Sequence, residues 1–239
     1  MYVTSQRVDT EALLAIQHSL WSMTPDTGTL AWLKDQLMAV KGTPWRPADA
    51  LASFCRMEIQ YMRAHPEDLA RYRAKMIQIV KDERAGKQIQ HLSNEELLTR
   101  AKDSFDDFLG SSLTILGGDL VYKEKHDALM KRISQAEQRA SEGNMIAILL
   151  DPVKSAGPYY RLHVHGVALL NAIVVAVDIY RAAAESKKLP SVLPVGCPVD
   201  PYSGQAFAYE MTDAGFVLRC RTAPVDSSTV REFEFRLRE

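Results

Sequence analysis

Apolar residues recur at helical spacing along the first two thirds of the chain. Leu13, Ile16 and Leu20, for example, are three or four residues apart and therefore share one face of a helix. Proline and glycine interrupt this pattern at intervals and divide it into separate helices. The pattern predicts helices from Asp9 or Thr10 to about Thr24, from about Leu30 to Gly42, from Pro47 to about Ala64, from Pro66 to about Val80, from Ser93 through Phe108, and from Asp119 to about Glu142.

Two polar segments between these helices have different signatures. Ser93 is followed three residues later by Glu96, the spacing of a capping box, which opens a helix. The segment from Lys81 to Lys87 is polar and contains Gly86, so we expect a solvated turn there. Leu113 to Leu116 is a short apolar segment between glycines, and its pattern does not distinguish helix from strand.

The most apolar stretch of the chain runs from Gly166 to Val177. It has 12 residues, is interrupted by Asn171 and is followed at once by Asp178. A membrane-spanning helix needs about 20 apolar residues. We therefore expect no membrane span in this chain, but a buried helix from about Pro158 to Lys187 at the centre of the fold.

After Leu189 the pattern changes from helical to extended. Four prolines within a dozen residues exclude a helix, and Asp200 to Gly204 has turn chemistry. Residues 206–210 and 216–221 flank a second turn and predict a β-hairpin. Charged and apolar residues then alternate from Arg231 to Arg238, which is typical of a half-buried strand.

These elements predict an α+β protein. Its body is mostly α-helical, and a small C-terminal antiparallel sheet packs on the long central helix. We divide the chain into a helical region, residues 1–143, and a region of 144–239 that holds the long helix and the sheet. A single continuous domain is the alternative.

Composition narrows the class of protein. The 239 residues include 29 basic and 30 acidic side chains, so no basic surface for nucleic acid is expected. A hydrophobic fraction of 46% allows a real core and excludes a disordered chain. Three cysteines are too few for a disulfide scaffold, but they allow one pair and one free thiol.

Candidate chemistry is sparse. His163 and His165 would share a face on a strand and could then bind a metal ion, but on a helix they point about 200° apart, which favours core or surface histidines. Cys55 lies among apolar residues on one face of a predicted helix, and we interpret it as a buried thiol. Asp106 and Asp107 are adjacent on a helix, so they do not face each other as a catalytic pair. We expect no cofactor, and no pattern identifies a reaction.

Residues from Asn144 to Cys220 resemble a known module. The helix ends in Tyr-Arg-Ala at 180–182, and a Pro-rich stretch leads to Asp-Pro-Tyr-Ser-Gly-Gln at 200–205 and to Gly-Phe-Val-Leu at 215–218. This is similar to the C-terminal module of uncharacterised bacterial envelope proteins and, in turn, to the major pseudopilins of type II secretion.

The resemblance implies a location in the cell envelope or periplasm, with the cytoplasm as the alternative, and work through protein–protein association. The residues to which it gives structural roles are Asp200, Pro201 and Gly204 in the turn and Phe207, Tyr209, Phe216 and Phe235 in sheet packing.

Two features of the sequence differ from the pseudopilin pattern. The chain lacks the apolar anchoring helix with which pseudopilins begin. Asp226-Ser227-Ser228 offers one carboxylate where many pseudopilins bind calcium, so calcium is not expected.

Cys197 and Cys220 lie on opposite sides of the predicted hairpin. They are either reduced thiols of a cytosolic protein or a disulfide that pins the Pro-rich loop to the sheet. The resemblance to envelope proteins favours the disulfide. For function, we expect a non-enzymatic protein that associates with a protein partner. The alternative is a small-molecule binder or hydrolase with a pocket in the helical region that uses His126, His163 or His165.

Overall fold

The computed structural model describes residues 11–20, 26–42 and 47–237. The protein is mostly helical, and three short antiparallel strands form a small sheet at its C-terminal end. The predicted α+β class is therefore confirmed.

The chain forms two compact units. We call Met1–Trp45, Val121–Lys123 and Arg161–Glu239 the sheet unit, and Arg46–Leu120 with Glu124–Tyr160 the helical unit. This division differs from the expected one between residues 143 and 144. The reason is that the N-terminal helices pack with the sheet and that one long helix, α8, contributes to both units.

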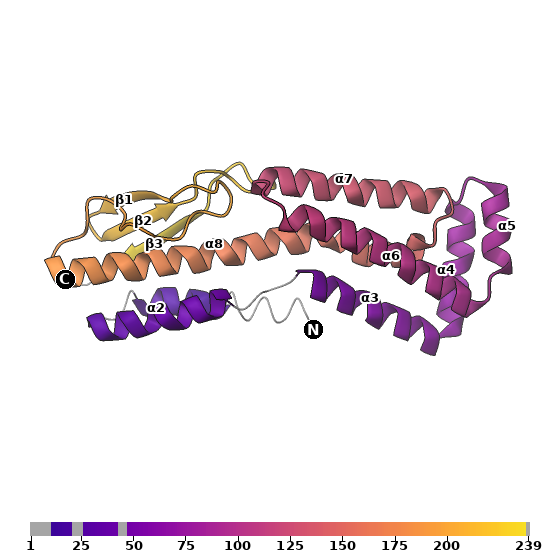
Figure 1. Ribbon diagram of the computed structural model, residues 1–239, viewed down its shortest axis with the longest axis horizontal. Coiled ribbons are helices and arrows are strands. Elements are labelled where there is room, and N and C mark those ends of the chain that lie inside the picture. The colour runs from indigo at the N-terminus through magenta and orange to yellow at the C-terminus, as the bar shows by residue number, and fades with distance from the viewer. Residues whose placement is uncertain (1–10, 21–25, 43–46, 238–239) are drawn as a thin grey trace. The chain divides into compact units, whose positions relative to one another are not determined.

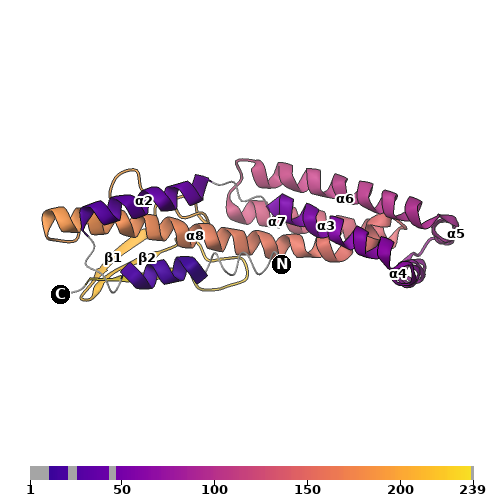
Figure 2. The ribbon, with the colours of Figure 1, turned by 90° about the horizontal axis from the view of Figure 1, so that it is seen from below.

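The sheet unit combines helices with the three-stranded sheet (Figures 1 and 2). Its elements are the helical residues 11–20, α2 (Thr27–Gly42), the C-terminal part of α8 (Leu150–Ser186), β1 (Ala208–Thr212), β2 (Gly215–Arg219) and β3 (Glu232–Arg236). The strand order is β1-β2-β3, both pairs are antiparallel, and Phe216 pairs with Phe235. The predicted helix to Thr24 is described only for residues 11–20, which are helical.

The sheet packs against α8. Every residue from Ala168 to Val177 is buried. The ring of Tyr180 meets Phe216 of β2 edge-on at 5.5 Å between ring centroids, and its hydroxyl donates to the carbonyl of Arg236 at 2.8 Å. The apolar helix therefore lies at the centre of this unit, as its composition predicts.

The N-terminal helices add further cover in the same unit. Lys34 of α2 forms an ion pair with Asp178 of α8, with 2.6 Å between Nζ and Oδ1. Gln17 donates its side-chain amide to the carbonyl of Glu234 in β3 at 2.9 Å. The edge strand β3 is thus partly capped by a helix, while β3 itself buries Phe233 and Phe235 and exposes its charged residues.

The helical unit is built from amphipathic helices. They are α3 (Pro47–Ala64), α4 (Pro66–Ile79), α5 (Glu83–His91), α6 (Asn94–Gly117), α7 (Tyr122–Ser141), the short 3-10 helix η1 (Met145–Leu149) and the first part of α8. Within this unit α6 packs against α3 and η1, and α4 packs against α3, α5 and η1. Figure 1 shows α6 and α7 running side by side.

Local capping determines where helices α6 and α5 begin. The capping box of Ser93 and Glu96 is present at the start of α6. The solvated turn expected from Lys81 to Lys87 is wrong, because α5 begins at Glu83. The side chain of Asp82 accepts from the amides of Arg84 and Ala85 and so starts this helix, and Ile89 anchors it by burial. The undecided segment Leu113–Leu116 continues α6.

Two other helix starts also differ from expectation. Helix α8 begins at Leu150 and not at Pro158; Pro152 occupies its first turn, where a missing N–H costs nothing, and Pro158 is accommodated inside the helix. Helix α7 begins at Tyr122 and not at Asp119, and Leu120, which precedes it, is exposed.

Among the described residues, one helical stretch is long and apolar enough to cross a membrane by length and composition. It comprises Met145–Ser186, 42 residues, and 67% of its most apolar window is buried inside the protein. The core helix of a soluble protein passes the same test, and the burial against the sheet follows that pattern.

Candidate functional site

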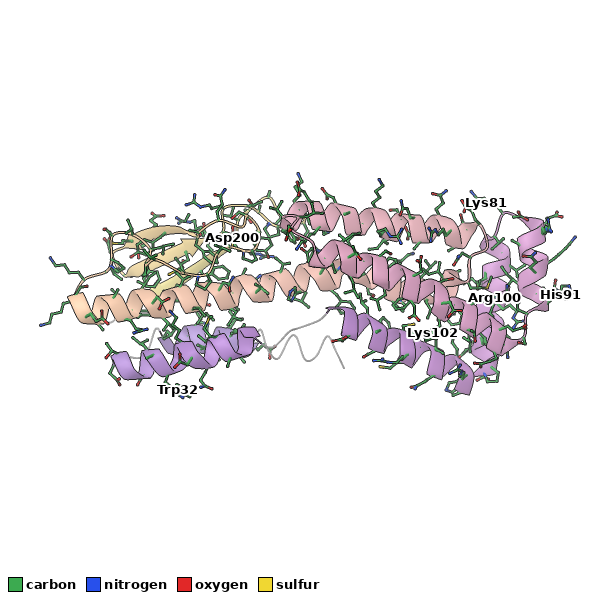
Figure 3. All side chains as sticks on the ribbon, in the orientation of Figure 1. Trp32, Lys81, His91, Arg100, Lys102 and Asp200 are labelled. Carbon is green, nitrogen blue, oxygen red and sulfur yellow. The ribbon has the colours of Figure 1, made fainter. Side chains whose placement is uncertain are left out.

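The Asp-Pro turn is organised by a buried carboxylate. Asp200 has no exposed surface, and its carboxylate accepts from the amide of Tyr202 at 2.9 Å, the hydroxyl of Ser203 at 2.7 Å and the amide of Arg221 at 2.8 Å. Its backbone closes the turn with Gly204, whose φ of +71° suits glycine. We call Asp200 and these donors the Asp200 cluster; Figure 3 labels Asp200 beside the sheet.

Cys220 completes the Asp200 cluster. The buried Cys220 thiol hydrogen-bonds the Asp200 carboxylate, and burial together with that negative charge raises the thiol pKa far above its ordinary value. A thiol held protonated is a donor and not a nucleophile. The cluster therefore joins the turn to the end of β2.

The aromatic residues with expected sheet roles meet on one face. Phe216 lies between Phe235, stacked at 5.2 Å, and Tyr209 at 5.8 Å between ring centroids. Phe207 meets Phe233 at 6.3 Å, and the Tyr209 hydroxyl donates to the carbonyl of Pro190 at 2.9 Å. Pro201 follows Asp200 in the turn and is partly exposed.

The expected disulfide is absent, and this corrects the sequence analysis. Cys197 and Cys220 are free thiols with different neighbours. The Cys197 sulfur lies 3.9 Å from Oδ2 of Asp178 on α8, whereas Cys220 is turned to Asp200. Burial, together with the Asp178 carboxylate, raises the pKa of Cys197 to about 11, so this thiol is also protonated at neutral pH.

The two candidate metal ligands lie on α8. Burial lowers the pKa of His163 to about 4, and burial with the charge of Arg231 lowers the pKa of His165. Neither belongs to a group of three metal-ligating side chains in the described part of the chain. The one such group there is His65, Glu67 and Asp68 at the start of α4.

That group is a poor metal site. His65 and Glu67 are exposed or nearly so, and Asp68 already accepts the Tyr61 hydroxyl at 2.7 Å and pairs with Arg71. The N-terminal end of a helix also carries positive potential, which disfavours a cation.

Clefts of about 290, 340 and 340 Å³ lie in the described part of the helical unit. No histidine lines them, and His126 is buried on α7 outside all three. Cys55 lies at the cleft between α3 and α6, where burial raises its pKa to about 11. Arg132 and Asp103 line the 290 Å³ cleft. Sequence reasoning missed them because each lies on a different helix.

No protein-family model matches the chain, and no curated protein or solved structure shows significant similarity to it.

Proposed function

We propose that this chain is a non-enzymatic protein of the cell envelope that works by protein–protein association through its sheet unit. The resemblance of residues 144–221 to the C-terminal module of envelope proteins and pseudopilins supports the proposal. So does the arrangement of an apolar helix, a Pro-rich connection, an Asp-Pro turn and a small antiparallel sheet.

The observation that carries the proposal is the Pro-rich loop before the turn. We call residues 190–199 the valine loop; its sequence, PSVLPVGCPV, contains no charged residue. Val192 is 71% exposed, Val195 is fully exposed and Val199 is 46% exposed. Exposed apolar side chains gathered on one loop are typical of a binding surface.

The valine loop is nevertheless held in place. Tyr209 binds its first carbonyl, Pro190, and the side-chain amide of Asn171 donates to its last carbonyl, Val199, at 2.8 Å. Between these ends, Cys197 contacts Asp178 of α8. A loop ordered before binding loses less conformational entropy when a partner docks, so it is suited to contact an apolar patch on another protein.

The reactive side chains of the chain favour association over catalysis. Burial raises the pKa of all three cysteine thiols and lowers the pKa of His163 and His165. A cysteine nucleophile needs a lowered pKa or an adjacent base. The three thiols are thus kept in their protonated form, which is not nucleophilic.

Site-specific photo-crosslinking tests the proposal. A photoreactive amino acid replaces Val195 in the full chain, expressed in the cells that produce it, and the control carries it at Glu185, an exposed position on α8. We expect one dominant protein adduct from position 195, recovered with the envelope fraction, and none from position 185. The triple variant Val192→Ser, Val195→Ser, Val199→Ser should abolish binding of the identified partner while retaining the folded spectrum. No adduct at 195, or the same adducts at both positions, overturns the proposal.

The alternative function, a small-molecule binder with a pocket in the helical region, is favoured by a separate observation, the polar cleft between α6 and α7.

A further inference from the structure

The cleft between α6 and α7 is lined by charged groups of both signs. It has a volume of about 290 Å³, and Asn144 and Ile146 also line it. Helix α6 contributes Asp103, Ser104 and Asp107, and helix α7 contributes Arg132, Gln135 and Arg139.

Helical spacing places these charges in register along the cleft. Asp103 and Asp107 are one turn apart, about 6 Å, on the same face of α6. Arg132 and Arg139 are two turns apart, about 10 Å, on one face of α7. The cleft therefore presents carboxylates from one wall and guanidinium groups from the other.

These opposite charges are only partly paired with each other. Arg139 lies 3.4 Å from a carboxylate oxygen of Asp107. The half-buried Arg132 hydrogen-bonds two neutral groups, Ser111 and Gln135, and among the described residues it reaches no carboxylate. Within the same described part of the chain, Asp103 makes no hydrogen bond or ion pair.

A half-buried guanidinium that is held only by neutral acceptors gains when a carboxylate approaches it. The neighbouring Asp103 would repel a simple anion and attract an ammonium group. Conversely, the two arginines would repel the positive charges of a diamine. A ligand that carries both charges satisfies both walls at once.

We propose that this cleft binds a small zwitterion of the α-amino-acid class, with its carboxylate on Arg132 and its ammonium group on Asp103. The volume is at the small end of ligand sites, as a free amino acid requires. A second cleft of about 340 Å³ shares Asp103, Ser104 and Asn144 and adds Gln88 and Arg100, which leaves room for a polar side chain along α6. The proposal is independent of the association through the valine loop.

Calorimetry and thermal-shift measurements on the full chain test this site. The probes are the twenty free amino acids, and the controls are succinate, putrescine and inorganic phosphate. We expect saturable binding of at least one amino acid with polar side chain and none of the three controls. Arg132→Gln and Asp103→Asn should each weaken that binding by about tenfold or more.

Matched variants separate the site from general effects. Lys131→Gln and Asp119→Asn remove exposed charges of the same sign outside the cleft and should leave binding unchanged. If Arg132→Gln fails to fold, Asp103→Asn decides, because its carboxylate is exposed and makes no contact that folding needs. Binding of no amino acid, equal binding of phosphate or succinate, or binding unaffected by Asp103→Asn overturns the proposal.

Discussion

The Asp200 cluster of the sheet unit and the α6–α7 cleft of the helical unit use charge in opposite ways. The carboxylate of Asp200 is fully buried and takes its donors from Tyr202, Ser203 and Arg221. In the cleft, Arg132 has only neutral partners and Asp103 has neither a hydrogen bond nor an ion pair among the described residues.

The difference separates a structural role from a binding role. A buried charge whose hydrogen bonds are all made by the protein contributes to a unique fold and has nothing left to offer a ligand. Charges that line an open cleft and form no ion pair contribute little to stability, but they remain available to a ligand. Stability measurements on matched variants of the two sites can therefore break or sharpen this comparison.

Asp200→Asn should have the largest effect. The asparagine side chain replaces a charged acceptor, and its NH₂ group would face either the backbone N–H of Arg221 or the hydroxyl of Ser203, which are donors to Asp200. We therefore expect the free energy of unfolding to decrease by about 3 to 4 kcal/mol. Urea unfolding followed by circular dichroism measures it, with Asp35→Asn on the exposed face of α2 as control. Equal stability of the two variants would show that the Asp200 cluster does not hold the turn.

Gly215→Ala and Gly157→Ala compare close packing in the two units. A Cβ at Gly215, which has a φ of +151°, would lie 2.1 Å from the backbone oxygen of Phe235. One at Gly157 would meet the flexible Met130 side chain at 2.9 Å and Ile133 at an ordinary contact distance of 3.7 Å. We expect Gly215→Ala to cost about 2 to 3 kcal/mol and Gly157→Ala less than about 1 kcal/mol. Thermal unfolding of both variants in one buffer gives the ranking, and a reversed ranking contradicts it.

The half-buried His163 should make the sheet unit sensitive to acid. The pKa of His163 is about 4 in the folded chain, whereas the ordinary value for histidine is 6.5. Between pH 6.5 and pH 4, therefore, the unfolded state takes up a proton at this residue and the folded state does not. The contribution to stability is full above pH 6.5 and falls as the pH decreases from 6.5 to 4, by on the order of 3 kcal/mol.

His163→Gln should remove that part of the pH dependence. The difference in the free energy of unfolding between variant and parent, measured from pH 7 to pH 4, isolates it from the carboxylates. His91→Gln, at an exposed position of α5, should leave the slope unchanged. A slope that persists in His163→Gln would assign the acid sensitivity to other groups.

Asp103→Asn should have the smallest effect on stability. Its carboxylate is exposed and takes no part in a hydrogen bond or ion pair within the described residues, so the expected change is within about 0.5 kcal/mol. Differential scanning calorimetry without added ligand measures it. A loss comparable to that of Asp200→Asn would remove the distinction between the two sites.

Short-range patterns predicted the elements that are determined locally. Ser93 and Glu96 define a cap within four residues, and the alternation around Phe233 and Phe235 follows from the period of a strand. The start of α5 was missed, although Asp82 is a good capping residue, because the polar run to Lys87 hides the single anchor, Ile89. Helix α8 begins earlier than the pattern predicts, because a proline such as Pro158 signals a boundary but is accommodated inside this helix.

The candidate sites also differ in how far the sequence predicts them. The residues of the Asp-Pro turn carry a signal in the sequence, since Asp200, Pro201 and Gly204 lie within five positions. The cleft carries only a weak signal in the sequence. The spacing of Asp103 with Asp107, and of Arg132 with Arg139, places each pair on one face of its helix. It does not predict that the two faces meet. The cysteines show the limit again, because Cys197 and Cys220 could form a pair in the sequence and have different partners in space.

The sequence by itself determined most of the helices, the Asp-Pro turn, the strands and the apolar central helix, because hydrophobic period, caps and turn residues act over a few positions. Only the tertiary structure decided which N-terminal helices join the sheet unit, that the Asp200 carboxylate is satisfied while Arg132 and Asp103 are not, and that the valine loop is fixed with its side chains exposed. Those outcomes depend on contacts between residues far apart in the chain, and such contacts are selected by packing rather than by local pattern.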